Sequence, residues 1–85
     1  MALSLYFISQ SERDDYDTYD SAIVAAENPK EAKMIRPDRY TWENVKEETG
    51  YPSWATDLKN VKVKLIGFAK AGTKKGVILA SFNAG

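Results

Sequence analysis

The chain has 85 residues, of which 44% are hydrophobic, enough for one small domain with a modest core. It contains no cysteine, which excludes disulfide bonds and cysteine-based zinc sites, and its formal net charge of zero gives no support for generic nucleic-acid binding. No stretch approaches the roughly 20 apolar residues that a transmembrane helix needs, and the N-terminus lacks the basic segment of a signal peptide, so we expect a cytoplasmic protein.

Two strands are predicted in the first third of the chain. Residues 3–9 are rich in aromatic and aliphatic side chains and end at a polar cluster, as is typical of a strand. Residues 10–20 are mostly polar, with several Asp and Ser residues, and indicate a connecting loop. Residues 21–26 are nearly all small or branched apolar residues, which predicts a second strand with both faces covered.

A helix is predicted over residues 29–35. Asn28 can accept a hydrogen bond from a free amide at the helix start, and Pro29 has the backbone conformation that the first helical position needs. Glu31 is placed to return a second hydrogen bond to the start of the helix. Pro37 should end the helix, because the residue before a proline disfavours helical geometry.

The remaining segments predict turns, one further short helix and two strands. A helix through Trp42 is possible before a set of turns anchored by Trp54. Residues 61–68 alternate apolar side chains with lysine and predict a half-exposed strand. Residues 77–82 predict the last strand, and the short loop before it favours an antiparallel hairpin of these two strands.

These elements predict a single α+β domain over residues 1–85. The expected order is β-β-α-(α)-β-β, a mainly antiparallel four-stranded sheet under one helical layer. Charge is separated along the chain, because acidic residues crowd positions 12–20 whereas only lysines carry charge after Asp57. The two regions can pair within one molecule, associate head to tail between copies, or remain solvated. Since so small a domain is marginally stable, we expect a homo-oligomer.

The run Tyr-Asp-Thr-Tyr-Asp-Ser at residues 16–21 is the first candidate binding site. Tyr16 and Tyr19 offer rings for stacking, and Asp17 offers an acceptor for hydroxyl or amine groups. The alternative is an ordinary loop with local turn hydrogen bonds. Asp15 and Asp17 begin the spacing of a calcium loop, but the glycine that such a loop requires is missing, so we predict no metal site.

A second candidate site combines guanidinium groups with aromatic rings. Arg36 and Arg39 can bind phosphate through paired hydrogen bonds while Trp42 stacks nearby. The alternative gives Arg36 the role of capping a helix C-terminus and Trp42 a place in the core.

The end of the chain is the third candidate. Ser81 and Asn83 should project from one face of the last strand, where they can reach a ligand or another subunit. The alternative is a frayed and solvated terminus.

Catalysis is not expected. The chain has no histidine and no cysteine, so acid–base or nucleophilic chemistry would depend on strongly perturbed carboxyl, phenol, amine or hydroxyl groups. A domain of this size has little interior in which to perturb them. We therefore predict a protein that is not an enzyme and uses no cofactor.

Three segments resemble a family of short uncharacterised proteins of bacteriophages and prophages. They are Leu-Tyr-Phe-Ile-Ser-Gln at residues 5–10, Tyr-Asp-Thr-Tyr-Asp-Ser-Ala at residues 16–22 and Gly-Val-Ile-Leu-Ala-Ser-Phe-Asn-Ala-Gly at residues 76–85. The resemblance carries no known activity, but it implies a viral protein in the host cytoplasm. Small accessory proteins of this kind often evade host defence by occupying a host protein or sequestering a signalling nucleotide.

The sequence thus predicts a phage-type accessory binding protein that captures a small anionic or nucleotide-like ligand. The alternative is an interaction module that docks on a host factor and inhibits it, through an exposed strand edge or the charged faces. The residues expected to bind the ligand are Tyr16, Asp17, Tyr19, Arg36, Arg39, Trp42, Ser81 and Asn83.

Overall fold

The computed structural model describes residues 3–12, 18–38, 42, 54–55 and 57–83. In this part of the chain the α+β prediction is confirmed, with antiparallel strands and one short α-helix. The predicted helix through Trp42 falls mostly outside the described residues. The elements are β1 (Ser4–Gln10), β2 (Thr18–Ala26), α1 (Pro29–Met34), the single-turn helix η1 (Leu58–Asn60), β3 (Val61–Phe68) and β4 (Gly76–Asn83).

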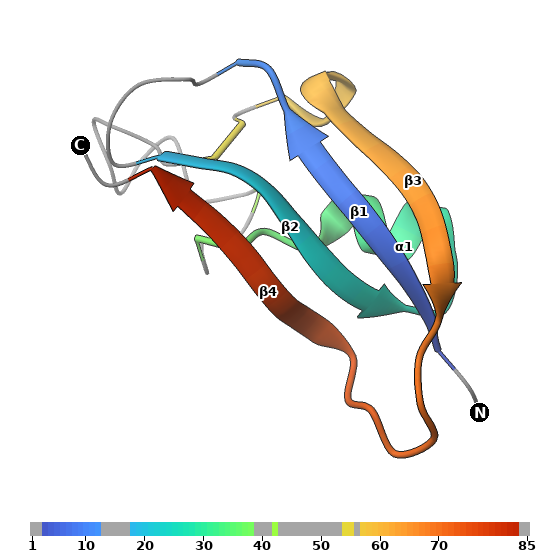
Figure 1. Cartoon of the computed structure of the whole chain (residues 1–85). Helices are drawn as coiled ribbons and strands as arrows, with labels where there is room; N and C mark the ends of the chain where they lie inside the picture. The colour runs from blue at the N-terminus through green and yellow to red at the C-terminus, as the bar shows by residue number, and fades with distance from the viewer. Residues whose placement is uncertain (1–2, 13–17, 39–41, 43–53, 56, 84–85) are drawn as a thin grey trace.

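The four strands form one antiparallel sheet in the order β3-β1-β2-β4 (Figure 1). The predicted hairpin of the last two strands is therefore wrong, because β3 and β4 lie at opposite edges. The β1–β2 hairpin occupies the centre and has two free edges, and each later strand pairs with one of them. The connection over residues 69–75 must cross roughly 14 Å, three strand spacings, which seven residues span easily.

β2 begins earlier than the sequence predicts. The strand starts at Thr18 rather than Ser21, because Thr18 and Tyr19 pair with Asn83 and Phe82 at the end of β4. Local composition favours a loop at these Asp-rich positions, and the long-range pairing with β4 overrides it. Part of the predicted loop is thus a strand.

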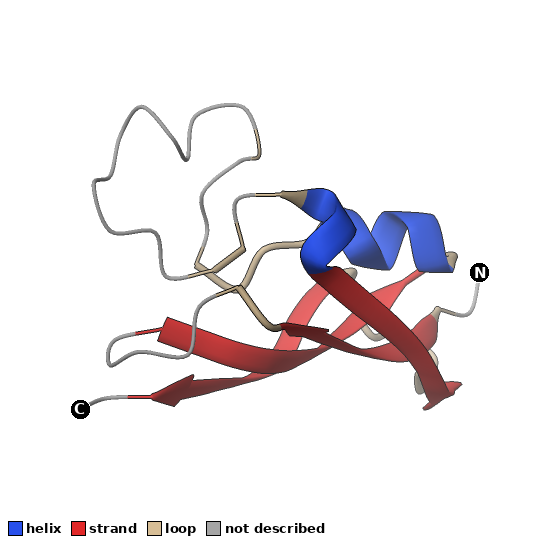
Figure 2. Cartoon of the chain, turned by 90° about the horizontal axis from the view of Figure 1, so that it is seen from above, coloured by secondary structure: helices blue, strands red, loops and turns tan. Residues whose placement is uncertain are grey.

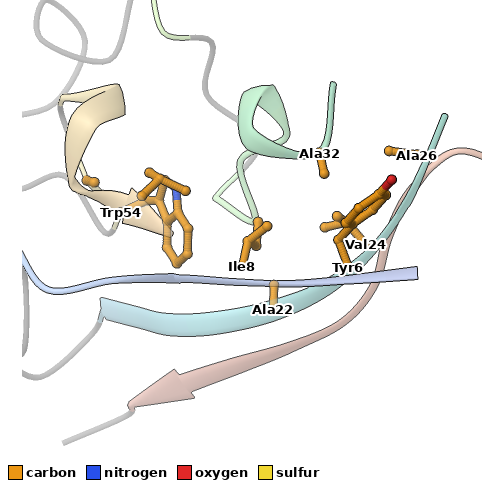
Figure 3. Packing of buried hydrophobic residues seen from close by; sticks show 9 residues of the cluster. Tyr6, Ile8, Ala22, Val24, Ala26, Ala32 and Trp54 are labelled. Carbon is orange, nitrogen blue, oxygen red and sulfur yellow. The ribbon is translucent and has the colours of Figure 1, made fainter. Parts of the chain in front are cut away.

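The core lies on one face of the sheet. Side chains alternate along β1 and β2, so that Tyr6, Ile8, Ala22 and Val24 point to the same side and are buried (Figure 3). Ala32 from α1 packs against this layer. The predicted anchor Trp54 is fully buried above the same face, and it is among the largest buried side chains.

The described residues leave part of the opposite face of the sheet exposed. Figure 2 shows α1 on one side of the sheet, and no described helix or strand covers the other side. The prediction that β2 has both faces covered holds at Ala25, which is fully buried on this face, but not at Ile23, which is only partly buried. Within the described residues, no helix is long and apolar enough to cross a membrane.

The start of α1 confirms the predicted cap. The Asn28 side chain accepts a hydrogen bond from the Glu31 amide at 2.8 Å, and Pro29 occupies the first turn. The Glu31 carboxylate accepts one from the Glu27 amide at 2.9 Å. It also lies 3.0 Å from Lys75 Nζ, so the helix start is joined to the β3–β4 connection.

The ion pair of Glu31 with Lys75 makes stability depend on pH. The hydrogen bond from the Glu27 amide and the Lys75 ammonium lower the pKa of Glu31, and the Glu31 carboxylate raises the pKa of Lys75. The contribution of Glu31 is present above its unfolded pKa and is lost as pH falls through the folded value. The contribution of Lys75 is present below its unfolded pKa and is lost as pH rises through the folded value.

We expect Lys75→Gln to lower the urea midpoint of unfolding at pH 7, since it removes this pair. The difference from the unsubstituted protein should shrink as Glu31 becomes protonated at acid pH. Lys74→Gln is the matched control, because Lys74 is the exposed neighbouring lysine. Equal effects of the two substitutions at every pH would contradict the account.

Candidate functional site

The candidate site is the corner where β2 begins and β4 ends, residues 18–21 and 81–83, here called the β2–β4 corner. Thr18 pairs with Asn83, Tyr19 with Phe82, and Ser21 with Ser81. The two segments are far apart in the sequence, and each contains predicted binding residues. The observed strand order places the two segments side by side. The predicted hairpin of the last two strands did not imply this contact.

Two aromatic rings form the apolar part of the corner. The ring centroids of Tyr19 and Phe82 are 4.7 Å apart, with an angle of 56° between the planes. Tyr19 is partly buried and packs against the core, whereas Phe82 is 45% exposed. Tyr19 therefore fixes the pair to the fold, and Phe82 presents aromatic surface on which a planar group can stack.

The Tyr19 backbone is held by a side chain of the core layer. Gln10 is buried at the end of β1, and its Nε2 donates a hydrogen bond to the Tyr19 carbonyl at 2.9 Å. A buried amide that is hydrogen-bonded in this way stabilises one local backbone geometry. The sequence gives no signal for this role of Gln10, because the partner depends on strand pairing.

Polar groups lie on the opposite face of the same strand ends. A β-bulge leaves Asp20 without a partner residue on β4, and its exposed carboxylate accepts a hydrogen bond from Ser21 Oγ at 3.2 Å. Ser81 is exposed and lies opposite Ser21. The corner thus offers carboxylate and hydroxyl oxygens that can accept hydrogen bonds from hydroxyl or amine groups. Asp20 was not among the predicted binding residues.

Arg36 lies outside the β2–β4 corner, and hydrogen bonds within the fold hold its guanidinium. Its guanidinium donates two hydrogen bonds to the Asp38 carboxylate, at 3.0 and 2.7 Å, and one to the Ala55 carbonyl at 2.6 Å. The side chains of Arg36 and Asp38 are 1% and 2% exposed. A guanidinium buried in this way is not accessible to a ligand. Arg36 therefore has a structural role, but its acceptors are Asp38 and Ala55 and not the helix C-terminus that the alternative assumed.

Trp42 belongs to the same arrangement. Its ring lies 4.3 Å from the Arg36 guanidinium, a cation–π contact, and its Nε1 donates to the Met34 carbonyl at 3.1 Å. The indole also packs against the core. Arg36, Trp42 and Asp38 together connect the end of α1 to the segment of Trp54 and Ala55.

The other predicted residues cannot be placed in the corner. Tyr16, Asp17 and Arg39 lie outside the described residues, as does Asp15 of the rejected calcium spacing. The structure therefore brings together Tyr19, Ser81 and the backbone of Asn83, and places Arg36 and Trp42 in a separate cluster at the end of α1. The corner residues themselves include no lysine or arginine.

Comparison with known proteins gives no family. No protein-family model, curated protein or solved structure matches this chain. The resemblance to phage proteins therefore stays a prediction, and any functional proposal rests on the residues and their geometry.

The buried pair of Arg36 and Asp38 should matter for stability. We expect Asp38→Asn to reduce the free energy of unfolding by about 3 kcal/mol, because it leaves the guanidinium buried with a neutral partner. Lys59→Gln is the control, since Lys59 and Asp57 form an exposed pair at 3.7 Å. That substitution should change the free energy by less than about 0.5 kcal/mol. Equal effects in urea denaturation would contradict the structural role of Arg36.

Proposed function

We propose that this protein is a phage-type accessory binding protein that captures a small nucleotide-like ligand, with the β2–β4 corner as part of its site. The observation that supports the proposal is the direct pairing of two segments that each carry binding-type residues. It brings the half-exposed ring of Phe82 to the same corner of the sheet as the hydroxyl of Ser81 and the carboxylate of Asp20, which lie on the opposite face of the strand ends.

The groups at the corner suit the base and sugar of a nucleotide. A base can stack on Phe82, and each stacked base contributes about 1–3 kcal/mol of binding. The Asp20 carboxylate and the Ser81 hydroxyl, on the other face of the strand ends, can accept hydrogen bonds from ribose hydroxyls or from an exocyclic amine of a ligand that extends around the corner. Phosphate recognition then falls to cationic groups outside the corner, and Arg39 remains the predicted one.

Binding without turnover is the proposed mode of action. The chain has no histidine or cysteine for acid–base or nucleophilic chemistry. A protein that holds a signalling nucleotide in the host cytoplasm lowers its free concentration, and this is how we propose that it evades host defence. It needs no cofactor for this role.

The test is isothermal titration with a panel of linear and cyclic nucleotides. We expect heat of binding with at least one of them, and Phe82→Ala should weaken that binding by about 10- to 100-fold, the loss of one stacking contact. Phe68→Ala is the matched control, because Phe68 is an exposed phenylalanine on the other edge strand, at 78% exposure. It should leave the affinity unchanged.

Two results would contradict the proposal. One is the absence of heat with the whole panel, together with no absorbance near 260 nm in the purified protein. The other is a nucleotide that binds equally to the Phe82→Ala and Phe68→Ala variants, which would place the ligand away from the corner.

A second candidate function is docking on a host protein. It is favoured by the two edge strands, where Ile66 on β3 and Ile78 on β4 are about half exposed, at 48% and 51%. An extended segment of a partner can pair with such an edge by backbone hydrogen bonds. This function predicts a host protein that is retained in pull-down and a purified protein without a small ligand.

A further inference from the structure

The sheet face that points away from α1 carries a continuous apolar surface, here called the outer face. The registers place Phe7 of β1 next to Ile23 of β2, and Ile23 next to Leu79 of β4. The next pair on this face of the same two strands is Leu5 of β1 with Ala25 of β2. The outer face is thus apolar across three adjacent strands.

Part of this surface is accessible to solvent in the single chain, although Ala25 within it is fully buried. Phe7 is 38% exposed and Leu79 is 66% exposed, and no described helix or strand covers them (Figure 2). Contiguous apolar patches on small soluble proteins commonly mark contact sites. A domain of this size also has few other ways to bury more apolar surface.

Charged groups flank the apolar rows on opposite sides. On β3, Lys62 and Lys64 pair with Ser9 and Phe7 of β1, so both lysines belong to the outer face. Toward the β4 edge, the Asp20 carboxylate is hydrogen-bonded to Ser21 Oγ, and Ser21 pairs with Ser9 on this same face. One edge of the outer face is therefore positive and the other carries a carboxylate.

This distribution is complementary to itself under one particular symmetry. A two-fold axis that runs parallel to the strands between β1 and β2 reverses the strand order, so β3 of one copy lies over β4 of the other. Positions along the strands are kept, which sets Lys62 of each copy over the row of Ser81, near Asp20 of the other copy. Phe7 of each copy then faces Ile23 of the other, and the aliphatic part of Lys64 lies over Leu79.

The alternative two-fold axis is disfavoured by charge. An axis perpendicular to the strands places β3 over β3, so that the lysine pairs of the two copies face each other. Like charges in contact are unfavourable. The charge pattern thus selects the first arrangement, with two equivalent pairs of Lys62 and Asp20.

We propose that the outer face is the interface of a homodimer, in which two sheets pack face to face about the axis parallel to their strands. The strand spacing and length give each outer face a footprint of about 500 Å², or roughly 1,000 Å² for both copies, which is near the lower size limit of specific interfaces. The dimer is a β-sandwich with α1 of each copy on its outside.

The first test is the oligomeric state by size-exclusion chromatography with light scattering. The unsubstituted protein should be a dimer, and Leu79→Lys should be a monomer with an unchanged circular dichroism spectrum, since Leu79 is exposed in the single chain. Lys30→Glu is the control on α1, where Lys30 is exposed away from the outer face, and it should remain a dimer.

A charge exchange tests the symmetry axis. Lys62→Glu and Asp20→Lys should each weaken the dimer about five-fold or more, because each creates two repulsive contacts. The double substitution should restore the dimer. Since the chain has no cysteine, Ser9→Cys can also be cross-linked by a short bis-maleimide, and it should give covalent dimers where Lys30→Cys does not.

Three results would overturn the proposal. A monomer at every concentration shows that the outer face is not a self-interface. A dimer that survives Leu79→Lys, or that cross-links only through Lys30→Cys, places the interface elsewhere. If Leu79→Lys abolishes the dimer but the double charge exchange does not restore the dimer that each single charge substitution weakens, the proposed axis is rejected.

Discussion

The structure depends on one constraint, which is that the described helices pack on only one face of the sheet. Tyr6, Ile8 and Val24 form the inner layer of the central hairpin, and α1 and Trp54 cover it. Ala55 and Val61 belong to the same buried cluster. This packing leaves nothing in the described part of the chain to cover the outer face, where Leu79 remains exposed.

The central position of the β1–β2 hairpin determines where everything else lies. Both outer edges of this hairpin need backbone partners, so β3 and β4 separate to opposite sides of the sheet. This separation brings Phe82 to Tyr19, which creates the corner, and it also sets the lysines of β3 far from Asp20. The proposed ligand site and the proposed dimer thus have a common origin in the strand order.

Local sequence patterns predicted most of the helices and strands, but they did not predict which strands pair. The cap at Asn28 and the strand of residues 61–68 follow from short-range chemistry, and both are confirmed. The hairpin of the last two strands was wrong because loop length does not reveal which edge of the central hairpin is free. For the site, Tyr19 and Ser81 were predicted separately, whereas Asp20 and the burial of Arg36 depend on partners distant in sequence.

The most direct measurement of the central claim, that a second copy covers the open face, is an isotope-filtered NOE experiment on a mixture of labelled and unlabelled protein. The account predicts intermolecular contacts between the Phe7 ring of one copy and the Ile23 methyl groups of the other. Contacts confined to the edges of β3 or β4, or no intermolecular contacts in a sample shown to be dimeric, would contradict it.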